Sequence, residues 1–92
     1  MINSKKIQSV LARMVVLLHF SGRDDWAKAL GKLEAKTRSD ANANYAEILS
    51  MYGGMGSLND LILYKSGQLL LEESDEFDSL RSDLYRLCRE LN

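Results

Sequence analysis

The chain has 92 residues, of which 46% are hydrophobic and 27% are charged, a composition typical of a folded domain rather than of a disordered chain. One cysteine and one histidine cannot form an internal disulfide or a zinc site with four nitrogen and sulfur ligands, so we expect a cytoplasmic protein without a cofactor. The net charge of -1 argues against a strongly basic nucleic-acid binder.

The first predicted element is a helix over residues 4–20, because apolar residues recur there at intervals of three and four. Lys5 and Lys6 imitate the start of a secretory signal, but Arg13 interrupts the apolar stretch. The unbroken apolar run, residues 14–18, is far shorter than the roughly 20 residues of a membrane span. We therefore expect no membrane insertion.

Two further helices follow. Asp24 and Asp25 suit the positive end of a helix that begins near Arg23. Lys32, Lys36 and Arg38 lie in its last turns, where the helix dipole is negative. Apolar residues spaced along residues 41–52 then predict a third helix.

The segment over residues 57–73 has two possible structures. LILY and LLLEE flank KSGQ, which favours a buried hairpin with a Ser-Gly turn. The alternative is a helix that begins at Ser57 with Asp60 in a capping box. We prefer the hairpin, because Gly67 would interrupt a continued helix.

The last helix is predicted to begin with Ser74 as its N-cap and to carry acidic residues in its first turn. The expected fold is therefore a mostly helical α+β single domain over residues 1–92, with about four helices, one short hairpin and about half of the residues helical. Its core is expected to include Trp26, Leu30, Leu49, Phe77, Leu80, Leu84 and Leu87.

Charge is divided unevenly along the chain. Residues 1–38 contain eight basic and three acidic residues, a net charge of +5, whereas residues 39–92 contain four basic and ten acidic residues, a net charge of -6. The two halves could attract each other across the fold, or the acidic half could form a patch for a basic partner.

The glycine-rich stretch over residues 53–57 could bind an anion through its backbone N–H groups. It lacks the lysine of a P-loop and the preceding strand of a dinucleotide fold, so we favour a bend in which Gly53 ends the third helix. Asn59 and Asp60 would then bind the backbone of their own turn, with a recognition edge as the alternative.

The sequence GGMGSLNDL at residues 53–61 precedes an acidic segment and LRSDLYRL at residues 80–87. Together these segments resemble a family of short bacterial proteins of uncharacterised function that carry a GGMGSxNDL motif. The resemblance covers approximately residues 45–91. It implies a bacterial, cytoplasmic, single-domain protein and supplies no activity.

No residue pattern favours catalysis. His19 ends an apolar helix, and Cys88 falls on the apolar stripe of the last helix, as expected for a packed thiol. We therefore predict a non-catalytic protein-binding module, such as an immunity-like inhibitor of a basic bacterial toxin domain. The expected partner-binding residues are Ser57, Asn59, Asp60, Glu72, Glu73, Asp75, Glu76 and Asp78.

The alternatives are a regulatory or adaptor protein with another partner, or a weak nucleic-acid binder. Lys28, Lys32 and Lys36 would serve the latter, because their spacing of four places them on one helix face. Self-association into a homo-oligomer stays open.

Overall fold

The computed structural model describes residues 2–39, 45–51 and 61–91. The first helix, α1, spans Ile2–Phe20 and confirms the helix expected over residues 4–20. It ends where Ser21 Oγ donates a hydrogen bond to the Leu18 carbonyl at 3.0 Å and Gly22 adopts a φ of 77°. This left-handed conformation at a helix C-terminus is available to glycine at little steric cost.

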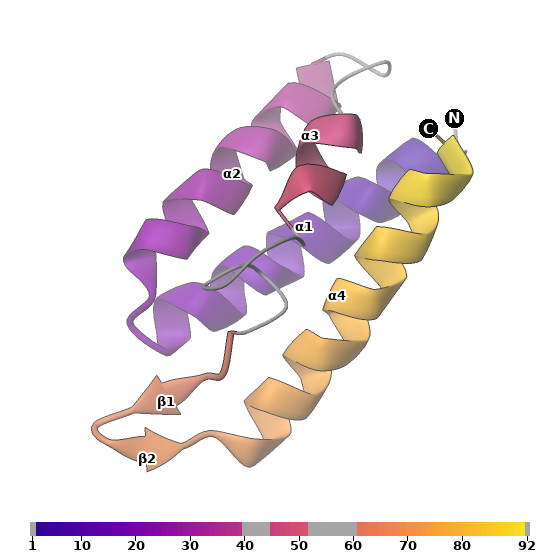
Figure 1. Cartoon of the computed structure of the whole chain (residues 1–92). Helices are drawn as coiled ribbons and strands as arrows, with labels where there is room; N and C mark the ends of the chain where they lie inside the picture. The colour runs from indigo at the N-terminus through magenta and orange to yellow at the C-terminus, as the bar shows by residue number, and fades with distance from the viewer. Residues whose placement is uncertain (1, 40–44, 52–60, 92) are drawn as a thin grey trace.

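Helix α2 spans Asp24–Ser39 and packs against α1 (Figure 1). Asp24 and Asp25 occupy its first turn, as predicted, and Lys36 and Arg38 lie in its last turn, so the charges complement the helix dipole at both ends.

Helix α3 spans Tyr45–Ser50 and lies within the helix that was expected over residues 41–52. Met51 forms a turn, with its N–H donating to the Ile48 carbonyl at 3.1 Å. The rest of that expectation, and the predicted bend at Gly53, lie outside the described residues.

The chain then forms a two-stranded antiparallel hairpin, with β1 at Tyr64–Lys65 and β2 at Gln68–Leu69. Ser66 and Gly67 form its turn with φ values of 53° and 77°, as a two-residue hairpin turn requires. The predicted hairpin is thus confirmed, but the expectation that it is buried is wrong, because all four strand residues are exposed. Figure 1 shows the reason: the hairpin extends past the ends of the helices, which cannot cover it.

Helix α4 spans Leu71–Leu91 and runs antiparallel to α1 (Figure 1). The prediction that Ser74 caps this helix is wrong. The Ser74 N–H donates to the Leu70 carbonyl at 2.8 Å inside the first turn, and Ser74 Oγ instead accepts from the Leu63 N–H at 3.3 Å. The Ser74 hydroxyl, which the local sequence suggested as a helix cap, therefore forms its hydrogen bond with the segment that leads into the hairpin.

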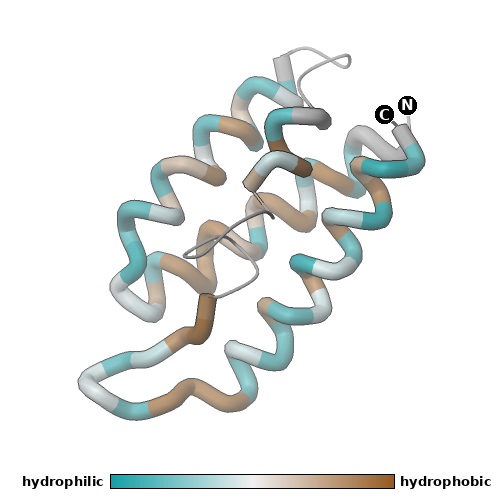
Figure 2. The backbone as a smooth tube through the Cα atoms, viewed as in Figure 1, coloured by the Kyte–Doolittle hydropathy of each residue, from teal (hydrophilic) through white to brown (hydrophobic). Residues whose placement is uncertain are grey.

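The helices have 19, 16, 6 and 21 residues, which exceeds the half of the chain that was expected to be helical. Apolar residues recur along the helices (Figure 2) and meet in one core cluster. Leu30, Phe77, Leu84 and Leu87 are buried, as predicted. Three other predicted core residues are only partly buried against this cluster: Trp26, Leu49 and Leu80.

Candidate functional site

A groove of about 330 Å³ lies between the second half of α1 and the first turns of α4. Its apolar base includes Val16 and Phe20, both about half exposed although they are large hydrophobic residues. We call it the acidic groove, because three carboxylates face one guanidinium along its walls. Its lining residues are Arg13, Val16, Leu17, Phe20, Glu72, Glu73 and Glu76.

An ion pair crosses the groove from α1 to α4. Arg13 Nε lies 2.5 Å from Glu76 Oε2, and Arg13 Nη2 donates to Glu76 Oε1 at 2.9 Å. This two-point contact lowers the pKa of Glu76, and the same hydrogen bonding, with Coulomb attraction from Glu76 and Glu73, raises the pKa of Arg13. Glu76 is therefore charged and held in place at neutral pH, while Glu72 and Glu73 leave the groove with a surplus of negative charge.

The hairpin contacts the Phe20 end of the groove. Lys65 Nζ lies 3.9 Å from the centroid of the Phe20 ring, a cation–π contact. This contact links the side chain of Lys65 in β1 to the last turn of α1, so residues of α1, the hairpin and α4 meet at this end of the groove.

The predicted acidic residues separate onto two sides of α4. Glu72, Glu73 and Glu76 line the groove, as a single partner-binding surface would require, but Asp75 and Asp78 do not line it. The helical period explains the division, because residues 75 and 78 follow Leu71 by four and seven positions and share its side of the helix. Ser57, Asn59 and Asp60, the other predicted partner-binding residues, lie outside the described residues.

Sequence reasoning missed the apolar base of the groove. Val16 and Phe20 fall beside the buried stripe of α1, so they contributed nothing to the predicted core or site. Arg13, Val16 and Phe20 are spaced by three and four residues, which places them on one face of a helix. This spacing was the available signal for a second apolar strip on α1.

The two residues considered as catalytic candidates are placed as follows. Cys88 is fully buried, which confirms the prediction of a packed thiol, and burial raises the pKa of this thiol to about 12. His19 is exposed, with Nδ1 2.9 Å from Asp24 Oδ1 at the junction of α1 and α2. In the part of the chain that the structure describes, no group of three or more His, Cys, Asp or Glu residues could hold a metal ion.

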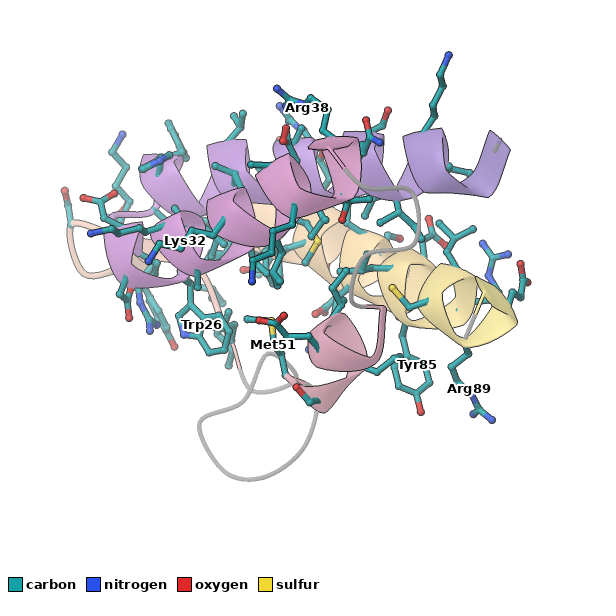
Figure 3. All side chains as sticks on the ribbon, turned by 90° about the horizontal axis from the view of Figure 1, so that it is seen from above. Trp26, Lys32, Arg38, Met51, Tyr85 and Arg89 are labelled. Carbon is teal, nitrogen blue, oxygen red and sulfur yellow. The ribbon has the colours of Figure 1, made fainter. Side chains whose placement is uncertain are left out.

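The basic row on α2 lies exposed, as expected for residues spaced by four. Lys32 and Lys36 line a second pocket of about 340 Å³ between α2 and α3, which Met51 also lines (Figure 3 labels Lys32 and Met51). Lys36 Nζ lies 3.6 Å from Glu47 Oε1. A carboxylate from α3 therefore neutralises part of this row.

Within residues 2–39, 45–51 and 61–91, no helix is long and apolar enough to span a membrane. The fold and the groove define a small, mostly helical protein with a short hairpin and an exposed acidic surface. Residues 20–71, more than half of the chain, match the model of a family described as Domain of unknown function (DUF6966), and the chain belongs to that family. The comparisons with curated proteins and with solved structures gave no match.

The family match overlaps the earlier resemblance over residues 45–71. It confirms the coarse prediction of an uncharacterised family. The match includes α2, α3 and the hairpin and ends at the first residue of α4.

Proposed function

We propose that this chain is a non-catalytic protein-binding module that takes a basic surface of its partner into the acidic groove. The observation that carries the proposal is the arrangement of two half-exposed apolar side chains, Val16 and Phe20, beside three carboxylates. Apolar contact area supplies affinity in such interfaces, while charge complementarity supplies encounter rate and specificity.

The finer form of the proposal is an immunity-like inhibitor of a bacterial toxin. A toxin that cleaves nucleic acid presents a basic cleft to the phosphate backbone, and a small acidic protein can cover such a cleft without any chemistry of its own. Adaptor proteins with another basic partner share the same requirement, so the identity of the captured protein separates the two roles.

The test begins with capture of partners from the native cytosol on the immobilised chain, followed by identification and binding kinetics with the purified partner. The test variant is Glu72→Lys/Glu73→Lys, which reverses two carboxylates in the first turn of α4. We expect it to slow association about tenfold or more, because charges around an interface steer the encounter.

The matched control is Asp24→Lys/Asp25→Lys. It makes the same change of charge, also in the first turn of a helix, and therefore carries a similar helix-dipole cost. If both variants slow association equally, the slowing depends only on the net charge of the chain, which would contradict a role for the groove. Inhibition of a captured nuclease by the chain would support the immunity role.

Nucleic-acid binding is the competing outcome. If the chain retains RNA or DNA rather than protein, and Lys28→Glu/Lys32→Glu abolishes the retention, the α2 row is the working surface and the groove proposal fails.

A further inference from the structure

The hairpin has an inner and an outer face, which its pairing register defines. Tyr64 pairs with Leu69 and Lys65 pairs with Gln68, so the two pairs point to opposite sides of the ribbon. Lys65 reaches the Phe20 ring of α1. The Lys65 pair therefore faces the helices, and the Tyr64 pair faces away from them.

The same alternation continues on both sides of the strands. The Leu70 N–H donates to the Leu63 carbonyl at 2.9 Å, which extends the pairing by one step toward the helices. Leu61 and Leu63 are buried, whereas Ile62 between them is 52% exposed. Ile62 thus shares the outward side with Tyr64, because side chains two positions apart in an extended chain point the same way.

Four large apolar side chains consequently lie on the outside of the hairpin and its junction with α4. Their exposed fractions are 52% for Ile62, 50% for Tyr64, 46% for Leu69 and 66% for Leu71. We call these residues the outer hairpin face. Single exposed hydrophobic residues are common, but a contiguous exposed group is typical of an interaction surface.

Charge identifies the occupant of this face. Asp75 and Asp78, the two predicted acidic residues outside the groove, follow Leu71 on the same side of α4 and are both exposed. Asp78 Oδ1 also lies 2.8 Å from Arg81 Nη2, so these three side chains together carry a net charge of -1. A second copy of the chain would bring the same net negative edge to this face and no surplus of positive charge. A partner with apolar residues flanked by lysine or arginine would satisfy both parts of the surface.

We infer that the outer hairpin face docks a basic amphipathic segment of the partner, with apolar side chains on Tyr64 and Leu69 and cationic side chains toward Asp75 and Asp78. The inference rests on the proposed function, since it names the apolar surface that the basic partner brings. It adds a second contact area, on the side of α4 that faces away from the groove.

The test uses a synthetic amphipathic helix of leucine and lysine as the probe and measures its dissociation constant by fluorescence anisotropy. Tyr64→Ser/Leu69→Ser should weaken binding about tenfold or more, as expected when central apolar contacts are lost. Tyr85→Ser is the matched control, because Tyr85 is also an exposed tyrosine, 39% accessible, on the distant half of α4 (Figure 3). It should change binding by less than about twofold.

A second variant protects the test against loss of the hairpin. Leu71→Ser leaves the Tyr64–Leu69 pair intact. It should also weaken binding of the peptide, while the thermal unfolding midpoint stays unchanged. Asp75→Lys/Asp78→Lys should weaken binding of the peptide and make its dissociation constant less dependent on salt concentration.

Two control peptides decide the chemistry. Replacement of the leucines by serine, or of the lysines by glutamate, should each abolish binding. Equal binding of the serine peptide would overturn the inference and leave the groove proposal standing. Dimerisation of the chain that Tyr64→Ser/Leu69→Ser abolishes would also overturn it, since a second copy would then occupy the face. Failure of the groove proposal would be recognised separately: the natural partner would then bind the Glu72→Lys/Glu73→Lys variant at the same rate as the parent chain.

Discussion

Two glycines illustrate how a single residue can act on stability in opposite directions. Gly67 has a φ of 77° in the hairpin turn, and Gly31 lies inside α2. A Cβ added at either position would meet no atom within 4 Å, so crowding contributes at neither site. The backbone conformation alone distinguishes them.

Gly67→Ala should lower the free energy of unfolding by about 1 kcal/mol, because a Cβ is penalised in the left-handed region. Gly31→Ala should raise it by about 0.5–1 kcal/mol, because alanine loses less conformational entropy in a helix. Urea unfolding of both variants measures the two changes. Changes of the same sign would contradict the assigned turn. Gly53→Ala, expected to cost about 1 kcal/mol if Gly53 ends α3, stays a prediction.

The Arg13–Glu76 pair gives stability a dependence on pH. Its guanidinium holds the pKa of Glu76 below the ordinary value of 4.5, so the folded chain binds fewer protons here than the unfolded chain. The stabilisation of the folded state by this ion pair is therefore complete above pH 4.5 and is lost as the pH falls through the lowered pKa of Glu76. The pair is largely solvated, with side-chain exposures of 50% and 39%, so the contribution is small.

Glu76→Gln should bring the unfolding curves of variant and parent together in acid and separate them near neutrality. Denaturant unfolding from about pH 3 to about pH 7 measures the difference. A constant difference across that range would show that Glu76 contributes through packing and not through its charge.

At the scale of elements, α4 connects the core to the surface. Phe77, Leu84, Leu87 and Cys88 fill one side of it, its first turns supply one wall of the groove, and Ser74 contacts the hairpin. A change in its packing would therefore affect both stability and the groove.

Leu84→Ala should lower the free energy of unfolding by about 2–5 kcal/mol, because Leu84 is fully buried and its removal leaves a cavity between α4 and its neighbours. Thermal and urea unfolding measure the loss. Leu80→Ala is the control, since Leu80 is only partly buried and should cost less. An unchanged midpoint for Leu84→Ala would contradict the assigned core.

At the scale of the whole molecule, ion pairs join the basic and acidic halves of the chain. Arg13 pairs with Glu76, and Lys36 pairs with Glu47. These contacts support the expectation that the halves attract each other across the fold. Because Glu72 and Glu73 also line the groove, a negative surplus stays available to a partner.

Association with a basic partner should slow as ionic strength rises, while dissociation changes little, because salt screens exposed charges beyond about 10 Å at 0.1 M. Stopped-flow kinetics from low salt to physiological salt measures both rates. Salt-independent association would exclude electrostatic steering by the acidic surface.

Sequence periodicity by itself determined the helices, the hairpin turn and four of the seven predicted core residues, because these depend on neighbours within a few positions. It placed Leu30, Phe77 and Leu84 inside from their spacing alone. Tertiary structure decided the rest. Ser74 bonds to Leu63, the hairpin extends beyond its helices, and the predicted acidic residues divide between two sides of α4. Each outcome depends on which distant segments meet in the fold. No local sequence pattern predicts that α1 packs against α4, and this packing brings Val16 and Phe20 into one groove with Glu72.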